Sequence, residues 1–254
     1  MYVLTYILIS MAILQWNCRG LRANFNDLGT LCKSYNPQAI CLRETHLKQS
    51  DSMTMRHFTF YNAYSTDSER AKGGASILVR QGVIHSHISL RTKMQAVAVQ
   101  LSLFRTITIC SVYIPPSENL LVQDLEDLAH QLPTPFVILG DFNSHNPLWG
   151  SDSTNNKGKK LEDFIAQNDL SLFNDGSNTY LHPATGTYSS IDLTITDPTL
   201  LNDFQWSVHG DMCGSDHFPI VIQPTLPLPE EHNPRWKFSK ADWDTSTHPS
   251  AQIN

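Results

Sequence analysis

The chain has 254 residues, enough for one large domain or two small ones, and its 41% hydrophobic and 17% charged residues are ordinary for a globular protein. Its formal net charge of −6 excludes a basic field over the whole surface, so a nucleic-acid partner would need a local basic patch or a bound cation. Five scattered cysteines, without a CxxC pair or a Cys/His zinc spacing, indicate reduced and mostly buried thiols.

Residues 1–12 form an apolar N-terminal extension, which we expect to be a lead-in or an extra edge strand. This apolar start is too short to span a bilayer and lacks the basic beginning of a signal peptide, so no membrane association is expected. Residues 13–222 are predicted to form one domain. Residues 223–254 carry five of the 14 prolines and are predicted to be a linker or tail without a core of its own.

Eight segments rich in Val, Ile, Thr and aromatic residues are predicted strands, separated by turn signals. They are residues 12–17, 38–42, 74–80, 96–103, 106–114, 136–141, 191–196 and 217–223. Three segments with apolar residues at helical spacing lie between them. These are residues 24–35, a helix that begins near Ser117 and ends before Pro133, and residues 158–170. The mixture favours an α/β or α+β domain built on packed sheets.

Polar side chains stand repeatedly at the ends of these strands, where a rigid framework can bring them to one site. The set comprises Asn17, Glu44, Tyr113, Asp141, Asn143, Asp192, Asp216 and His217. Taken singly, most have structural explanations, such as a turn for Asn17 or a surface acid for Glu44. Asp192 is harder to explain in this way, because an unpaired carboxylate within an apolar strand costs several kcal/mol.

The donor types in this set favour hydrolysis assisted by a metal. Asn and Glu oxygens are hard ligands that suit Mg²⁺ or Mn²⁺, ions that keep bound waters and engage phosphate. The sequence has no nucleophile elbow with a Ser-His-Asp order and no glycine-rich phosphate loop. Attack of water on a phosphodiester therefore fits the set better than acyl transfer or use of ATP.

Six motifs in order resemble those of the endonuclease/exonuclease/phosphatase superfamily: "WNCRG", "RETHL", "SVYIPP", "LGDFNSH", "SSIDLTI" and "SDHFPI". The resemblance covers about residues 13–222. It implies a four-layer α/β sandwich, in which helices flank two packed mixed β-sheets and the active site lies at one edge.

Within the superfamily, the chain is most similar to the apurinic-type endonuclease domain of LINE-type (non-LTR, jockey-like) retrotransposon polyproteins. The stretch "GDFNSHNPLWGS" and the later segment "RWKFSKADWD" carry this similarity. It implies a reverse transcriptase domain in the full-length element, which this sequence does not contain. We therefore expect a truncated copy or an isolated domain.

The resemblance implies a role for each matched residue. Glu44 and Asn17 would form the metal site, with Asp216 as a candidate second ligand. Asn17 could instead be mainly a structural partner of Glu44. Tyr113 would contact the scissile phosphate, and Asp141 would act in proton transfer, to the attacking water or to the leaving 3′-oxygen.

The remaining matched residues would act on the phosphate or the DNA backbone. Asn143 would position the water or stabilise charge on phosphorus. Asp192 would orient His217, which contacts the phosphate or serves as a base. Thr179 and Ser189 match positions that contact the DNA backbone.

Arg43 departs from the motif, because the family usually has Gln before the acid. A cation there could repel a metal, touch DNA phosphate, or be a drifted residue in a decaying copy. Further cations could contact DNA despite the negative net charge, among them Arg19 and the "KGKK" run at 157–160. That run could equally be a solvated helix start.

The stretch 136–151 contains two further features. Gly140 is expected to let the backbone turn closely after the strand. Trp149 is expected to pack the following loop rather than to read a base.

The sequence thus predicts a Mg²⁺- or Mn²⁺-dependent DNA endonuclease that nicks one strand and leaves a 3′-hydroxyl, which the resemblance implies to prime reverse transcription. The alternatives are an abasic-site repair endonuclease or another phosphodiesterase of the same fold, and an inactive remnant. A lipid phosphodiesterase is disfavoured because the Asp192 motif lacks the inositol-phosphatase pattern. Such a function implies a nuclear location, although no targeting signal is readable and a cytoplasmic location stays open.

Overall fold

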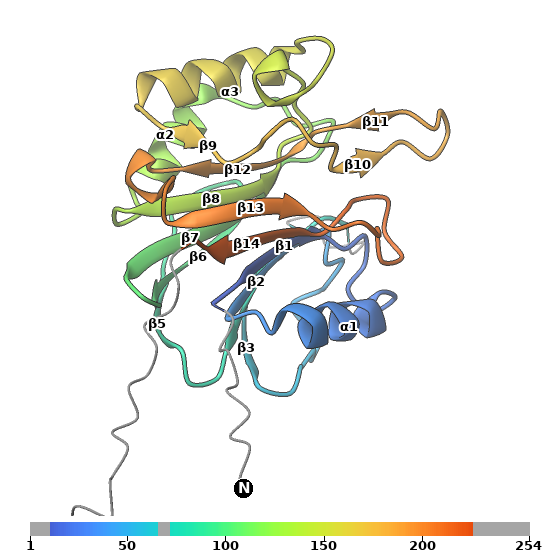
Figure 1. Cartoon of the computed structure of the whole chain (residues 1–254), viewed down its shortest axis with the longest axis vertical. Helices are drawn as coiled ribbons and strands as arrows, with labels where there is room; N and C mark the ends of the chain where they lie inside the picture. The colour runs from blue at the N-terminus through green and yellow to red at the C-terminus, as the bar shows by residue number, and fades with distance from the viewer. Residues whose placement is uncertain (1–10, 66–71, 226–254) are drawn as a thin grey trace, which may run out of the picture.

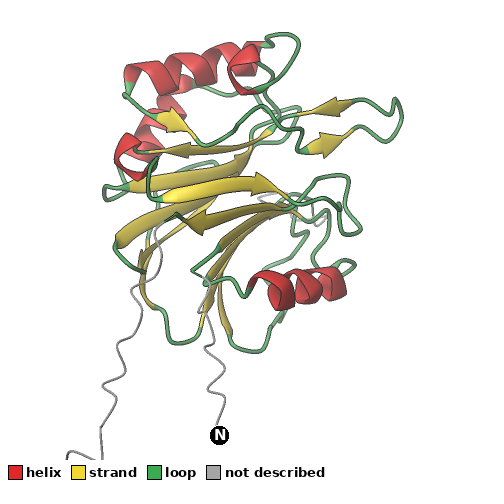
Figure 2. Ribbon diagram, viewed as in Figure 1, coloured by secondary structure: helices red, strands yellow, loops and turns green. Residues whose placement is uncertain are grey.

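Two six-stranded sheets pack face to face, and helices cover their outer sides (Figures 1 and 2). The computed structural model describes residues 11–65 and 72–225. Most of the predicted N-terminal extension and nearly all of the predicted tail lie outside these residues, so their roles stay predictions. The predicted α/β sandwich is confirmed. None of the described helices is long and apolar enough to cross a membrane.

The first sheet has the strand order β13-β14-β1-β2-β4-β3. Its strands are β1 (Ile13–Asn17), β2 (Ala39–Arg43), β3 (Phe58–Ala63), β4 (Ala75–Arg80), β13 (Phe204–Val208) and β14 (Ile220–Pro224). Strands β1 and β2 run parallel, and the other neighbours are antiparallel. The sheet is therefore mixed, as predicted.

The second sheet has the order β5-β6-β7-β8-β12-β9. Its strands are β5 (Ile84–Ile88), β6 (Gln95–Ser102), β7 (Thr106–Tyr113), β8 (Phe136–Asp141), β9 (Ser171–Leu172) and β12 (Asp192–Thr196). Strands β7 and β8 are its parallel pair. A separate short hairpin, β10 (Tyr180–Leu181) and β11 (Tyr188–Ser189), projects beyond the sandwich (Figure 1).

Three helices cover the sheets: α1 (Phe25–Tyr35), α2 (Val122–Ala129) and α3 (Asn156–Gln167), with 3-10 turns η1 (Pro147–Trp149) and η2 (Pro198–Leu200). The prediction that the second helix begins near Ser117 is wrong. The carbonyls of Pro115, Pro116 and Leu120 accept hydrogen bonds from lysines of α3, at 2.6, 3.1 and 2.9 Å. These bonds fix the segment before Val122 as a loop.

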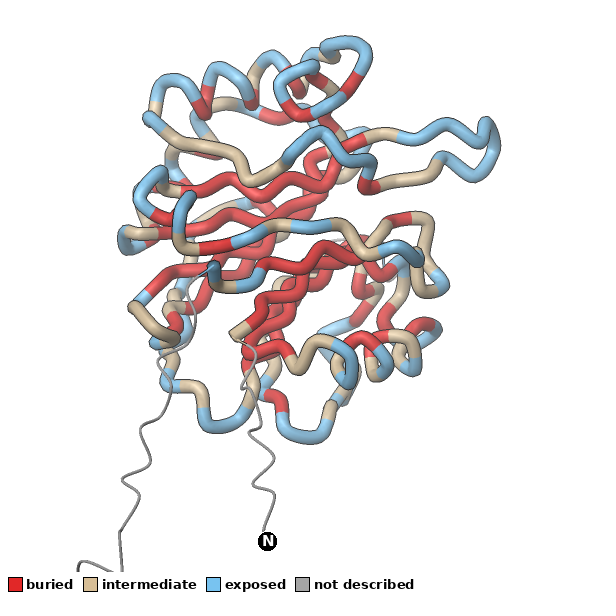
Figure 3. Tube along the Cα trace, in the orientation of Figure 1, coloured by how far each residue is buried: buried red, intermediate tan, exposed pale blue. Residues whose placement is uncertain are grey.

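The core has three parts that correspond to the three contacts between four layers. One lies between the sheets and includes Ile77, Val99 and Ile222. A second lies under α2 and α3, and a third lies under α1. The central strands are accordingly buried along their length, whereas the helices expose their outer faces (Figure 3). Each fully buried large aliphatic side chain stabilises such a core by about 1.5–3 kcal/mol.

The sheet register brings the predicted polar set to one edge. The parallel pair β1 and β2 ends together at Asn17 and Arg43, directly before Glu44. In the other sheet, Tyr113 at the end of β7 lies beside Asp141 at the end of β8. Asp141 is in turn paired with the first residue of β12, Asp192.

Candidate active site

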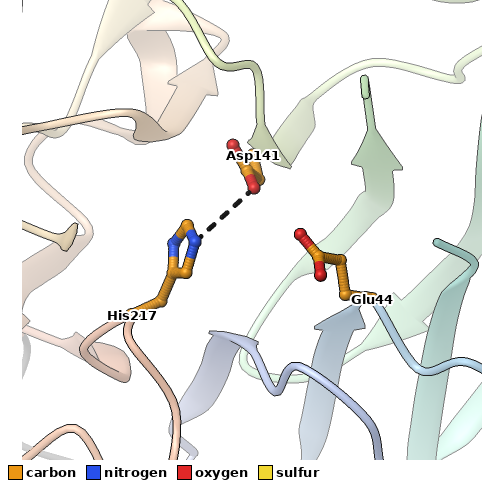
Figure 4. A group of neighbouring side chains, drawn as sticks. All are labelled: Glu44, Asp141 and His217. Atoms are coloured by element: carbon orange, nitrogen blue, oxygen red, sulfur yellow. Dashed lines mark ion pairs between the residues drawn. The ribbon is translucent and has the colours of Figure 1, made fainter. Parts of the chain in front are cut away.

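Three side chains from separate elements converge at this edge. One ligand atom from each of Glu44, Asp141 and His217 lies within 4.8 Å of the others. Figure 4 shows Asp141 at the end of its strand, facing His217 from the loop before β14, with Glu44 beside them. Glu44 has a φ of +46°, a left-handed conformation that directs the chain sharply away from β2. The structure thus brings together three residues of the predicted set.

Asn17 lies at the centre of this group. Its side-chain Nδ2 donates to Oε1 of Glu44 at 3.0 Å and to Oδ2 of Asp141 at 2.8 Å. The same nitrogen lies 3.3 Å from Nε2 of His217. Its Oδ1 accepts from the backbone N–H of Arg19. Asn17 therefore presents its nitrogen, not its oxygen, to the carboxylates, an arrangement that favours the alternative of a structural partner of Glu44.

His217 is held between two buried acids. Its Nδ1 lies 2.7 Å from Oδ2 of Asp192, and its Nε2 lies 3.9 Å from Oδ2 of Asp141. Burial by itself lowers the pKa of His217, but the negative charges of Asp192, Asp141 and Asp216 outweigh it and raise this pKa. The ring consequently tends to carry a positive charge, with Nε2 directed at the site.

Asp192 is ionised in this setting. Burial raises its pKa, and the cationic ring of His217, a hydrogen bond from that ring and the charge of Arg43 bring the pKa below the ordinary value. This pairing explains how an apolar strand accommodates an acid, which the sequence alone left open.

Glu44 and Asp141 differ in their tendency to hold a proton. Burial is the largest influence on both and raises the pKa of each. At Glu44, hydrogen bonds with His46 and Asn17 and the charge of His217 reverse this effect and lower the pKa to about 2. At Asp141, the neighbouring charges of Asp192 and Glu44 reinforce burial, and the pKa stays raised. Glu44 is therefore a permanent anion, whereas Asp141 can exchange a proton near neutral pH.

Tyr113 and Asn143 lie next to these acids. Tyr113 is buried, and burial together with the charges of Glu44 and Asp141 raises its pKa, so the hydroxyl keeps its proton. Asn143 has a φ of +48°, and its Nδ2 donates to Oδ1 of Asp141 and to the carbonyl of Ile114, both at 3.1 Å. Both side chains can therefore donate hydrogen bonds beside Asp141.

The other predicted residues lie around this centre. Asp216 forms an ion pair with Arg19, 3.2 Å between Oδ2 and a guanidinium nitrogen, and does not belong to the three-residue group. The Arg19 side chain is 56% exposed. Ser189 is partly exposed on the projecting hairpin.

Thr179 has a different place from the one predicted. It is fully buried, and its hydroxyl oxygen accepts hydrogen bonds from the backbone N–H groups of Ile191 and Asp192 at 3.1 and 3.0 Å. The buried hydroxyl therefore supports the start of β12, which does not fit the predicted contact with a DNA backbone.

Arg43 is buried completely, so the interpretation that it touches DNA phosphate is wrong. Its guanidinium donates to Oδ1 of Asp192 and to the carbonyl of Cys41, both at 3.2 Å. The cation is therefore paired with an acid behind the site.

Three further predictions concern the region from β8 to the start of α3. Trp149 is buried and donates from Nε1 to the carbonyl of Ser144 at 3.2 Å, so the prediction that it packs the loop is confirmed. Gly140 is not a turn residue: it lies within β8, where a Cβ would come within 2.5 Å of the Phe142 ring. The "KGKK" run lies at the start of α3, where Lys159 is exposed and Lys157 and Lys160 donate hydrogen bonds to loop carbonyls.

Among the residues that sequence reasoning missed, His46 and Ser215 contact the set through their side chains. Nε2 of His46 lies 3.5 Å from Oε2 of Glu44. The hydroxyl of Ser215 donates to the carbonyl of Asn17 at 2.8 Å and accepts from the backbone N–H of His217 at 3.2 Å. Both residues belong to quoted motifs, "RETHL" and "SDHFPI", which was the available signal.

Comparison with known proteins agrees with this architecture. A family model described as endonuclease-reverse transcriptase matches residues 107–221. The chain is 26% identical over 224 residues to a probable RNA-directed DNA polymerase from transposon X-element of Drosophila melanogaster, covering 85% of this chain and 24% of that protein. It is 25% identical over 233 residues to the RNA-directed DNA polymerase from mobile element jockey of the same organism, covering 89% and 25%. The chain spans about a quarter of the length of these relatives.

Solved structures share the fold. The endonuclease domain of TRAS1, a telomere-specific non-LTR retrotransposon, matches with a TM-score of 0.72 at 18% identity, covering 85% of this chain and 98% of that domain. The catalytic domain of APE2 from Xenopus laevis matches with a TM-score of 0.67 at 20% identity, covering 84% and 93%. The resemblance that the six motifs carry is thereby confirmed in both sequence and fold.

Proposed function

We propose that this chain, which resembles the endonuclease part of non-LTR retrotransposon proteins in sequence and fold, is a metal-dependent DNA endonuclease that leaves a 3′-hydroxyl. The observation that carries the proposal is the convergence of Glu44, Asp141 and His217, whose ligand atoms lie within 4.8 Å of one another. In the full-length element, the nick would supply the primer end for a reverse transcriptase domain, and the site of action would be the nucleus.

The donor set fits a divalent cation. Glu44 is ionised and Asp141 offers a second carboxylate oxygen within reach, which are the hard ligands that Mg²⁺ or Mn²⁺ takes. When bound, such a cation supplies positive charge against the phosphate oxygens. Of the other two predicted ligands, Asn17 would have to turn its amide to present oxygen, and Asp216 would have to leave Arg19.

The remaining side chains provide proton transfer and hydrogen bonds. Asp141, with its raised pKa, would exchange a proton with the attacking water or the leaving 3′-oxygen. Nε2 of His217, held by Asp192 through the opposite ring nitrogen, would donate to a phosphate oxygen. Tyr113 and Asn143 lie where their donors would position the phosphate and the water.

Nicking of supercoiled plasmid tests this proposal. We expect purified protein to convert the plasmid to the open circular form with Mg²⁺ or Mn²⁺, and EDTA to abolish the conversion. Glu44→Gln and His217→Ala should each lower the rate on the order of 100-fold or more, because each removes a group at the reacting centre. The nicked ends should be extended by a DNA polymerase without prior treatment, as a 3′-hydroxyl requires.

Matched controls are available on helix α2 and just after it. Glu126→Gln and His130→Ala make the same chemical changes at partly exposed and exposed positions of the outer helix layer, and should leave nicking unchanged. Wild-type activity in both Glu44→Gln and His217→Ala would refute the site assignment. A protein that cleaves only a duplex with an abasic position would favour the abasic-site repair alternative, and pure wild-type protein without any nicking would favour an inactive remnant.

A further inference from the structure

Arg43 is the one lysine or arginine among the buried residues of the described chain. The alternation of β2 explains its direction. Ala39 and Cys41 belong to the core between the sheets, and Arg43 lies two residues further on the same face. Its guanidinium therefore enters the space between the two sheets at the edge that carries the site.

The partner of Arg43 lies across this space. One guanidinium nitrogen, NH2, donates to Oδ1 of Asp192 at 3.2 Å, and the other, NH1, donates to the carbonyl of Cys41 at 3.2 Å. The second carboxylate oxygen of Asp192, Oδ2, holds Nδ1 of His217 at 2.7 Å. The two oxygens of one carboxylate are thus divided between Arg43 and His217, and all three side chains are buried.

We propose that Arg43 is a positioning residue for the nuclease reaction: by holding Oδ1 of Asp192, it fixes the carboxylate that orients His217. Its effect on rate rests on the function proposed above. The effect on the His217 ring does not, because it follows from the contacts alone.

The backbone of Asp192 is already fixed by other contacts. Its N–H donates to the hydroxyl oxygen of Thr179 at 3.0 Å, and its carbonyl accepts from Nδ2 of Asn174 at 3.0 Å. Pairing with Asp141 fixes its place in the sheet. The carboxylate itself is held by the side chains of Arg43 and His217 on opposite oxygens, with a further hydrogen bond from the Thr179 hydroxyl.

Charge balance supports the same conclusion. Glu44, Asp141 and Asp192 gather three acids around one imidazole, and an ionised carboxylate left without a partner in such a place is strongly destabilised. Arg43 supplies a permanent cation on the side of Asp192 that faces away from His217. Asp192 can then stay ionised while the His217 ring binds only one of its two carboxylate oxygens.

The test replaces Arg43 while keeping its bulk. Arg43→Met should lower kcat for nicking by about 10- to 100-fold with KM for DNA changed less than about twofold, since partners that orient a reacting group act at this level. Arg43→Lys keeps the charge and should recover most of kcat. Arg105→Met is the matched control: it breaks the Arg105–Asp203 ion pair of 2.6 Å away from the site and should leave kcat unchanged.

The NMR signal of the His217 ring separates positioning from loss of fold. In ¹⁵N-histidine-labelled protein in EDTA, the Nδ1 proton of His217 should give a protected downfield signal, assigned by its absence from His217→Ala. This signal should disappear in Arg43→Met and persist in Arg105→Met. Should Arg43→Met not fold, Arg43→Leu, which also carries no hydrogen-bond donor, should show the same loss of signal.

A double-mutant cycle completes the test. Because Arg43 acts through Asp192, Arg43→Met should have no further effect on kcat in an Asp192→Asn background. Additive effects of the two substitutions, or an unchanged His217 signal in folded Arg43→Met, would overturn the proposal. If wild-type protein does not nick DNA, the function proposed above fails, whereas the ring signal still decides whether Arg43 positions His217.

Discussion

At the scale of single residues, the two acids of the site differ because of what surrounds them. Burial raises the pKa of both acids, and Asn17 donates a hydrogen bond to each. Glu44 has a further hydrogen bond with His46, whereas Asp141 is more deeply buried and faces the charges of Asp192 and Glu44. A raised pKa in the folded state means that the folded form binds the proton of Asp141 more tightly than the unfolded form. Ionisation of Asp141 therefore costs stability, and this cost must appear in the pH dependence of unfolding.

We predict the pH dependence of Asp141→Asn in EDTA. The cost of ionising Asp141 begins above the pKa of an unfolded Asp, near 3.8, and is complete above the folded value of about 7. Asn carries no proton to lose, so the free energy of unfolding of the variant relative to wild type should rise between pH 5 and 7, by at most about 1.4 kcal/mol per pH unit. Above pH 7 the difference should level off.

Urea denaturation at each pH measures this difference. Asp152→Asn, at an exposed position, is the control and should show a constant difference. A flat difference for Asp141→Asn would mean that the folded protein does not raise the pKa of Asp141.

The sequence predicted the residues of the site better than their contacts. Strand ends and motif order predicted Glu44, Asp141 and His217, because a strand that ends in a polar group is a local pattern. The pairing of Arg43 with Asp192 was not predictable in this way, because 149 residues separate the two and only the packing of the sheets joins them. The prediction that Thr179 contacts DNA failed for a related reason. Its hydroxyl binds the backbone N–H groups of Ile191 and Asp192 at the start of β12, a contact that depends on how the chain folds back.

At the scale of elements, helix α3 is pressed against the loop that follows β8. Asn155 begins the helix: its Oδ1 accepts from the N–H groups of Gly158 at 2.7 Å and His145 at 3.1 Å. Its Nδ2 donates to the carbonyl of Asn143 at 3.3 Å. A Cβ on Gly158 would lie 1.9 Å from the carbonyl oxygen of His145, so the helix can approach this loop only with glycine there.

Gly158→Ala should consequently destabilise the protein by about 1–3 kcal/mol, because backbone must move to admit the methyl group. The control is Gly29→Ala in α1, where an added Cβ meets nothing within 4 Å. That change should stabilise the protein by about 0.5–1 kcal/mol through helix propensity. Chemical denaturation of both variants gives the comparison, and equal effects of the two substitutions would contradict the close approach of α3 to the loop.

Whether an element could be predicted depended on its burial. Strands such as β7 and β8 are buried along nearly all of their length, and their apolar runs were found from sequence. Strands β3, β5 and β13 were not predicted. They lie at sheet edges, where polar residues such as Asn62, His85 and Ser207 interrupt the apolar ones, so that no continuous apolar run marks them.

At the scale of the whole molecule, each sheet contributes to two of the three cores, one on each of its faces. The first sheet packs on α1 with one face and on the second sheet with the other, and the second sheet likewise contacts α2 and α3. Polar bonds also cross between the sheets: Thr194 donates to Oε1 of Gln15 at 2.7 Å, and Ser111 donates to the carbonyl of Leu42 at 3.2 Å. If one core is lost, a sheet that also forms part of a neighbouring core loses its support on one face. We therefore expect the four layers to unfold together.

Three cysteines allow this expectation to be measured, because each lies in a different core. Cys18 lies under α1, Cys41 between the sheets and Cys110 under α2 and α3. Burial raises the pKa of Cys18 and of Cys41 to about 12 and also raises that of Cys110, so all three thiols should resist alkylation in the folded protein at pH 8. Labelling under increasing urea, read residue by residue with mass spectrometry, should give the same free energy of opening and the same urea dependence at all three. A lower value at Cys18 alone would show that α1 detaches before the sandwich opens, and would contradict a single cooperative unit.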